Sequence, residues 1–416
     1  MRSNRVLVLV TGVAAIAIGI YAETNGSVGR NRSSNDPVSV AVDKGLKWLV
    51  SVQGKDGGWG QDGGETSYVR QGERLESNGN DVANTAVAAE ALLHSGSTPT
   101  RGEYHLSLDR AVRFILEHVE RSSGEGLAVT DLTGTQIQRK LGPYIDTFLT
   151  SKLLAELDGN MGDAQANARV RRSLEKCVAK VERGQLKDGS WNIAGGWAPI
   201  LGTSIASQSL NMARSKDVRV DGTTLGLVET YTAATVAPPP PAALAAGAAG
   251  GLSAGSGGGV GTAAERVRVG GAIAPATALA MSAEVSAASA GVSLYKRAQE
   301  LEQLSRTPDD RKKNGEQIKS ITAQLADPRF VTGFGSVGGE EFFSYLNISD
   351  SLRRAGGPEW ERWNRDMQAK ILKMQNEDGT WAGHHCITGR VAVTSAAILM
   401  LVADREKIVL TSSAKR

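Results

Sequence analysis

The chain has 416 residues, enough for two or three average domains or for one large repeat fold that carries an insertion. Lys and Arg total 47 against 44 Asp and Glu. This near-neutral balance, without long basic runs, excludes a nucleic-acid-binding protein, because phosphates are bound by clustered cations. The two cysteines, Cys177 and Cys386, are too few for a disulfide framework.

Residues 1–22 have the features of an export signal. Arg2 and Arg5 precede an uncharged apolar stretch, residues 6–22, which is somewhat shorter than the ~20 residues of a bilayer span. Because this stretch ends on a small residue, Ala22, we predict cleavage there and export to the periplasm or the medium. The alternative is an uncleaved membrane anchor, the one way in which we expect this chain to meet a membrane. Residues 23–37 are polar and are predicted to form a disordered linker.

The pattern Q-x-x-D-G-[GST]-W occurs three times along the chain. Its fixed positions are Gln53, Asp56 and Trp59, then Gln185, Asp188 and Trp191, and finally Gln375, Asp378 and Trp381. An amphipathic helical pattern precedes each copy, so each motif is predicted at a helix C-terminus. The Asp-Gly pair supplies a turn, the Gln amide can bond free backbone groups, and the indole can cover the helix end. A weaker copy at residues 113–126 keeps the turn glycines and lacks the Trp.

A second helix rich in Ala, Ser and Thr, with little charge, follows each motif. These second helices are predicted at residues 81–95, 145–157, 203–213 and 390–403. Helices that are apolar and small-sided all round are buried, whereas the motif-bearing helices each have one polar face. The sequence therefore predicts two concentric layers of helices.

Further helix pairs complete the predicted body. Residues 221–234 pair with 283–305, residues 311–326 pair with 338–354, and residues 358–375 pair with the final helix. The count is six pairs, divided into a first part at residues 38–235 and a second part at residues 272–405. Residues 406–416 are predicted to be a tail.

Two segments are predicted to leave the packed body, one between the two parts and one within the second part. Residues 236–271 contain a proline run and then little but Ala, Gly and Ser, so we expect a disordered insertion. Between residues 295 and 325 the pattern is charged and helical, with leucines of one helix facing isoleucines of the next. This is typical of a protruding helical hairpin, either an interaction surface or a lengthened solvated hairpin.

Residues 44–59 resemble the QW motif of squalene-hopene and oxidosqualene cyclases, a superfamily that includes protein prenyltransferase β-subunits. Residues 338–350 and 383–389 resemble a group of exported bacterial prenyltransferase or squalene oxidase repeat proteins. The resemblance implies an all-α fold, the (α/α)6 toroid of helical hairpins. In such relatives the motif braces the outer helices, and chemistry comes from separate residues at the inner ends of the barrel.

The chain departs from the catalytic patterns of these relatives. Class II cyclases protonate their substrate with an Asp of a D-x-D-D motif, and the only adjacent pair here, Asp309-Asp310, lies in a charged loop. An aromatic content of 5% is also low for a cavity that stabilises carbocations. Prenyltransferases hold zinc with an Asp, a Cys and a His, and the position of that Cys is taken here by Phe342 or Phe343. We therefore disfavour an isoprenoid cyclase or transferase.

The densest group of reactive side chains starts the last two inner helices. It comprises Glu340, Glu341, Tyr345, His384, His385, Cys386 and Arg390. Cys386, His384 and Glu340 could bind zinc, the one cofactor that the pattern suggests. The alternative is that the histidines cap the helix and Cys386 is a small buried residue. Arg390 opposes the helix dipole, so we expect it to meet an acid or an anionic ligand.

Three functional classes follow from this group. We favour an exported module that binds a small molecule, a glycan or a protein, because no complete catalytic set can be assembled. The alternative is a lyase or hydrolase acting on a polysaccharide, with Tyr345 and either His384 or His385 as acid and base and Arg390 neutralising a uronate. Glu340 and Glu341 would complete such a site. The isoprenoid enzyme is the third class.

Overall fold

The computed structural model describes residues 36–62, 69–70, 73–74, 79–193, 199–236, 292–305, 307–325, 339–383 and 387–405. The predicted export signal, the low-complexity residues 237–271 and the tail lie outside these ranges, while residue 236 ends a helix rather than starting the insertion. Within the described ranges, no helix is long and apolar enough to cross a membrane.

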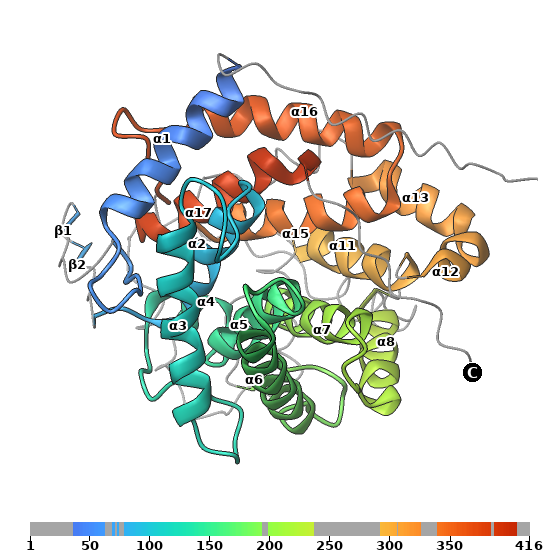
Figure 1. The fold of residues 1–416 in the computed structure, drawn as a ribbon. Coiled ribbons are helices and arrows are strands. Elements are labelled where there is room, and N and C mark those ends of the chain that lie inside the picture. Colours follow the sequence, from blue (N-terminus) through green and yellow to red (C-terminus); the bar gives the residue numbers. More distant parts are fainter. Residues whose placement is uncertain are drawn as a thin grey trace, which may run out of the picture. The chain divides into compact units, whose positions relative to one another are not determined.

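Helices account for nearly all regular structure, which confirms the all-α prediction (Figure 1). The longer helices are α1 (Pro37–Ser51), α2 (Val82–His94), α3 (His105–Arg121), α5 (Ile145–Leu157), α6 (Ala164–Arg183), α7 (Pro199–Ser215), α8 (Gly222–Val236), α11 (Val292–Leu304), α13 (Gly315–Leu325), α15 (Gly339–Ala355), α16 (Pro358–Lys373) and α17 (Arg390–Val402). The short ones are α4 (Gln136–Leu141), α12 (Pro308–Lys313) and the 3-10 turn Ala403–Arg405. Strands β1 (Val69–Arg70) and β2 (Glu73–Arg74) form one small antiparallel pair.

Six helices, which we call the core helices, pack in a closed cycle. Helix α2 contacts α5, α5 contacts α7, α7 contacts α11, α11 contacts α15, α15 contacts α17, and α17 returns to α2. Every residue of α5 except Glu156 is buried, and so is every residue of α17 except Arg390. This burial agrees with the helices rich in Ala, Ser and Thr that the sequence predicts at residues 145–157 and 390–403.

The other long helices, which we call the flanking helices, pack on the core helices, and all of them except α3 contact the core helix that follows them in the chain. Helix α1 contacts α2 as well as α17, α3 contacts α2 and α6, and α6 contacts α5 and α7. Helices α8, α13 and α16 pack against α11, α15 and α17 in the same manner. Helices α3 and α6 bury one apolar face only, as their amphipathic patterns predict.

The prediction of a protruding hairpin is wrong for its first helix, α11. Ala298, Leu301 and Glu302 are fully buried, and α11 packs between α7, α8 and α15. The error has a physical reason. Helix α11 carries a polar face that includes Gln299, Glu302 and Gln303, and all three side chains face other helices instead of water. Helix α13 packs on α11, as the apolar pattern predicted.

The three repeated motifs adopt one geometry. Each indole nitrogen donates to a carbonyl ten residues earlier, in the last turn of the preceding helix. The distances are 2.8 Å for Trp59 to Leu49, 2.7 Å for Trp191 to Val181 and 2.8 Å for Trp381 to Ile371. Each Trp backbone N–H donates to a threonine hydroxyl of the next core helix, at 2.9 Å for Thr85, 3.1 Å for Thr203 and 3.0 Å for Thr394. The motif therefore joins a flanking helix to its core helix.

The glutamine of each motif joins neighbouring flanking helices. Its amide nitrogen donates to the carbonyl of its own turn glycine and to a carbonyl in the first turns of another flanking helix. The second acceptors are Ser107 of α3 for Gln53 (2.9 Å), Thr224 of α8 for Gln185 (2.8 Å) and Ala41 of α1 for Gln375 (2.8 Å). The last of these bonds links the third motif to α1, the first described helix.

The motif glycines are required by conformation and by space. Gly57, Gly189 and Gly379 have φ of +93°, +91° and +88°, which L side chains rarely adopt. A Cβ at Gly189 would also lie 2.2 Å from the Leu227 carbonyl oxygen. The adjacent aspartate accepts the N–H two residues on, as Asp188 does from Ser190 at 2.9 Å, and this closes the turn.

Two lysines hold the weaker fourth copy, where Gln and Trp are absent. Lys176 of α6 donates to the carbonyls of Val119 and Ser122, each at 2.7 Å. Lys180 donates to four carbonyls between Ser123 and Ala128, the shortest at 2.6 Å. The neighbouring flanking helix thus supplies the hydrogen bonds that a motif glutamine supplies elsewhere.

We predict that Trp191→Ala lowers the free energy of unfolding by ~3–5 kcal/mol, because a buried indole is lost and its carbonyl partner is left unpaired. Trp360→Ala, at a partly buried Trp outside the motif, is the matched control and should cost less. Denaturant melts measure both. A loss below ~1 kcal/mol for Trp191→Ala would show that the indole does not hold the turn.

Candidate functional site

The predicted reactive group is described only in part. His384, His385, Cys386 and the side chain of Glu340 lie outside the described residues, so the zinc site stays a prediction. Among the side chains that the structure does describe, no three of His, Cys, Asp or Glu are grouped to hold a metal ion. The remaining members, Glu341, Tyr345 and Arg390, fall into two separate sets of contacts.

Glu341 and Tyr345 lie one turn apart on α15, and both are buried. Lys370 of α16 donates to the Tyr345 hydroxyl at 2.7 Å and lies 4.6 Å from the ring centroid. The Tyr345 ring also meets Trp363 edge-on. Burial, reinforced by the charge of Glu341, raises the pKa of Tyr345, and burial lowers the pKa of Lys370. Tyr345 therefore faces α16 as a protonated phenol, in the contact between a core and a flanking helix.

Arg390 meets an acid, which confirms one of the two outcomes predicted for it. Its backbone N–H and Nε donate to the Asp62 carboxylate at 3.0 and 3.2 Å, and its Nη1 donates to Asp378 at 3.3 Å. The guanidinium carbon lies 5.1 Å from the Trp48 ring centroid. Asp62 caps the start of α17, which offsets the unfavourable dipole that Arg390 meets there. Arg390 thus joins the third motif to the segment that follows the first.

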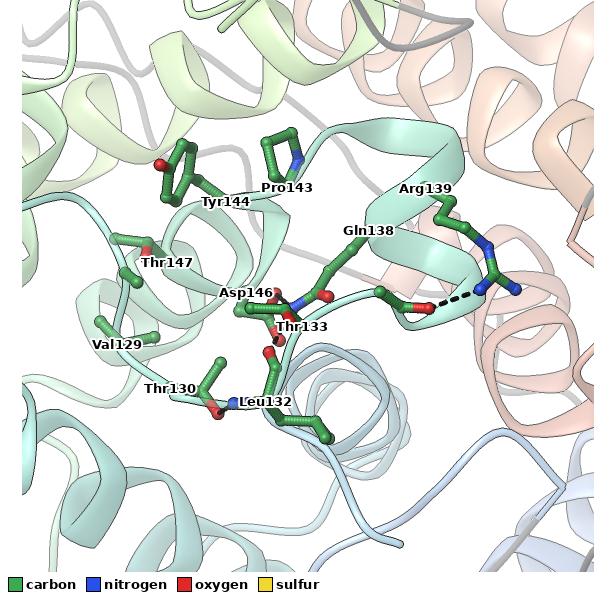
Figure 2. A pocket seen from close by; sticks show the side chains of 12 residues that line it. Val129, Thr130, Leu132, Thr133, Gln138, Arg139, Pro143, Tyr144, Asp146 and Thr147 are labelled. Carbon is green, nitrogen blue, oxygen red and sulfur yellow. Dashed lines mark hydrogen bonds between the residues drawn. The ribbon is translucent and has the colours of Figure 1, made fainter. Parts of the chain in front are cut away.

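A pocket outside the predicted reactive group lies over the start of α5 (Figure 2). Its volume is about 230 Å³, and it is lined by Ala128, Val129, Thr130, Leu132, Thr133, Gly134, Gln138, Arg139, Pro143, Tyr144, Asp146 and Thr147. Figure 2 shows Asp146 and Gln138 among the lining residues, joined by a hydrogen bond, with Arg139 at the edge. Sequence reasoning did not find this pocket.

Helix α4 shapes one wall of the pocket through a capping box. The Thr135 hydroxyl accepts the Gln138 N–H at 3.3 Å, and the Gln138 side chain accepts the Thr135 N–H at 3.1 Å. The Gln138 amide nitrogen then donates to the Leu132 carbonyl at 3.0 Å and to Asp146 at 2.7 Å. The T-x-x-Q spacing of the capping box was the sequence signal available for this wall.

Two buried carboxyl groups lie beside the pocket. Asp146 accepts the Ala83 N–H at 3.1 Å, and Asp81, the N-cap of α2, accepts the Asn84 N–H at 2.8 Å. Burial, with the charge of Asp146, raises the pKa of Asp81 to about 7. Burial raises the pKa of Asp146 to about 6. Both carboxyl groups therefore have a pKa above the usual range of an aspartate, with burial as the main cause in each case.

A second set of charges lies between the core helices. Lys152 of α5 donates to Glu90 of α2 at 3.2 Å, and His94 meets Glu156 at 2.5 Å. Burial raises the pKa of Glu90 to about 7, against the opposing effect of Lys152. A single acidic residue in a helix that is otherwise apolar and small-sided was the sequence signal for Glu90. The buried Cys177 is different, because burial raises its thiol pKa to about 12 and keeps it unreactive.

No protein-family model, curated protein or solved structure matches the chain.

We predict that Arg390→Ala lowers the free energy of unfolding by roughly 2–4 kcal/mol, because Asp62 is buried and loses its charge partner. Arg113→Ala is the matched control, since it removes an arginine from an exposed pair with Asp109 and should cost less than ~1 kcal/mol. Equal and small losses in denaturant melts would contradict the bracing role of Arg390.

We also predict a pH dependence of stability. The folded pKa values of Asp81 and Asp146, about 7 and about 6, exceed the values near 4 of unfolded chains. The native state then binds more protons between pH ~4 and ~7, so these two groups make stability fall as pH rises through that window. Asp146→Asn should flatten the decline, whereas Asp43→Asn, at an exposed acid, should not. Melting temperatures measured across this pH window test the prediction. Identical slopes of melting temperature against pH for wild type and Asp146→Asn would contradict a raised pKa of Asp146.

Proposed function

We propose that the chain is an (α/α)6 toroid of the terpenoid cyclase-like superfamily and an exported module that binds a small ligand. The closed cycle of core helices supports the toroid, and so does the strict alternation of flanking and core helices along the chain. Three equivalent turns of the Q-x-x-D-G-[GST]-W type support the relationship. Export rests on the sequence of residues 1–22.

The location of free space favours binding at the end of the core helices over catalysis between them. The cavity lined by α2, α5, α7 and α15 measures only about 20 Å³, far less than an isoprenoid or a sugar chain occupies. The pocket of about 230 Å³ lies instead between α4, the start of α5 and residues 128–134. This contrast is the observation on which the proposal depends.

The lining of the pocket suits a small amphipathic ligand. Val129, Leu132 and Pro143 offer apolar surface, the Tyr144 ring offers a stacking surface, and threonine hydroxyls offer hydrogen bonds. Asp146 can accept from a ligand donor, and the exposed Arg139 can pair with an anionic group. The volume is below the ~300–1,000 Å³ of drug-sized sites. A monosaccharide, an amino acid or one side chain of a protein partner has the matching size.

Ligand-observed NMR with monosaccharides, uronic acids and N-acetyl amino acid amides tests this proposal. Compounds that bind the wild type should lose their signal with Thr130→Trp, because the indole fills the pocket. Asp131→Trp is the matched control, since Asp131 is exposed in the same loop and does not line the pocket. Binding that survives Thr130→Trp, or absence of binding by the whole panel, would contradict the site. Depolymerisation of a uronate polysaccharide by the purified protein would favour the lyase or hydrolase alternative.

A further inference from the structure

A small cavity lies in the middle of the core helices. Its walls come from α2, α5, α7 and α15, and its volume is about 20 Å³. Helices α5 and α15 are opposite each other in the closed cycle, so a cavity that touches both lies at the centre of the cycle. The lining residues used below are Glu90, Lys152, Gln208, Asn347 and Asp350.

Three side-chain atoms of this lining are buried without a hydrogen-bond partner among the described residues. They are Glu90 Oε1, Gln208 Nε2 and Asn347 Oδ1, and their residues are 1%, 3% and 4% exposed. They come from three different core helices, α2, α7 and α15. Buried polar atoms in folded proteins are almost always hydrogen-bonded, to protein or to ordered water. Three such atoms around one cavity therefore point to a shared partner.

The neighbouring hydrogen bonds fix the orientation of Asn347. Its Nδ2 donates to the Ser204 hydroxyl at 2.9 Å. That hydroxyl donates in turn to the Glu302 carboxylate at 3.5 Å, so it is an acceptor towards Asn347. Asn347 Oδ1 is then an acceptor, as Glu90 Oε1 is, and Gln208 Nε2 is a donor. The site offers two acceptors and one donor, which matches the two donors and the acceptor lone pairs of one water molecule.

Charge and size distinguish water from an ion. Glu90 is paired with Lys152 at 3.2 Å, and Asp350 lies 3.7 Å from Arg353. Each of the two carboxylates thus has a cation beside it, which weakens its attraction for a metal ion. A water molecule needs a cavity of about 10–15 Å³, and about 20 Å³ is available here.

We propose that this cavity is a binding site for one ordered water molecule, hydrogen-bonded to Glu90, Gln208 and Asn347. The water joins α2, α7 and α15, helices that are not all neighbours in the closed cycle. It also solvates the second oxygen of Glu90, the one that Lys152 does not contact.

Magnetic relaxation dispersion of water oxygen-17 counts long-lived internal water in the full chain in solution. Asn347→Leu should lower this count by one, because leucine removes an acceptor and fills the space. Ser351→Ala is the matched control: it lies one turn further along α15, is buried, and does not line the cavity, so the count should not change. Should Asn347→Leu fail to fold, as judged by circular dichroism, Gln208→Met removes the donor and should give the same loss of one.

Three results would overturn the site. One is an unchanged count with a folded variant. The second is an oxygen-17 dispersion that disappears when sodium and potassium are replaced by choline, which would mean that a cation is bound at the site. The third is a crystal structure in which Glu90 and Gln208 bond each other directly.

Discussion

The hydrogen bond from a motif indole to a carbonyl ten residues earlier is the interaction on which the rest of this structure depends. It holds the turn against the end of its own flanking helix, as Trp59 does at Leu49. Once the indole is fixed, the Trp backbone N–H reaches a core-helix threonine and the motif glutamine reaches the next flanking helix. One buried turn thereby sets the spacing of three helices. In the fourth copy, which lacks Gln and Trp, two lysines of α6 donate to the carbonyls of the turn instead.

The cavity between the core helices is small, and the larger pocket lies at the helix ends. The core helices contact one another directly, and paired charges such as Glu90 and Lys152 lie between them. A buried charge is tolerated only when it is paired or hydrogen-bonded, so these pairs hold their helices in one arrangement and leave little volume for a substrate. The loop after α3 lacks a motif indole, and there the structure has a pocket with Asp146 beside it.

Much of the fold was predictable from local chemistry. The limits of α5 agree with the predicted residues 145–157, and the motif turns lie at helix C-termini as the Asp-Gly pairs indicated. Helix α11 was predicted to protrude into solvent because a polar face that packs on other helices has the same residue spacing as one that faces water. The pairing of Glu90 with Lys152 could not be predicted either, because it depends on which core helices lie next to each other. Arg390 was predicted to meet an acid or an anionic ligand, but Asp62 is distant in sequence and only the fold identifies it as the partner.

Native-state hydrogen exchange of the indole N–H groups tests the central claim most directly. If the motif indoles hold the turns, the Nε1 protons of Trp59, Trp191 and Trp381 should exchange only through global unfolding, with one common free energy. The partly buried Trp48 and Trp360 should exchange faster. Rapid exchange of any motif indole under native conditions, well below the global free energy, would contradict the account.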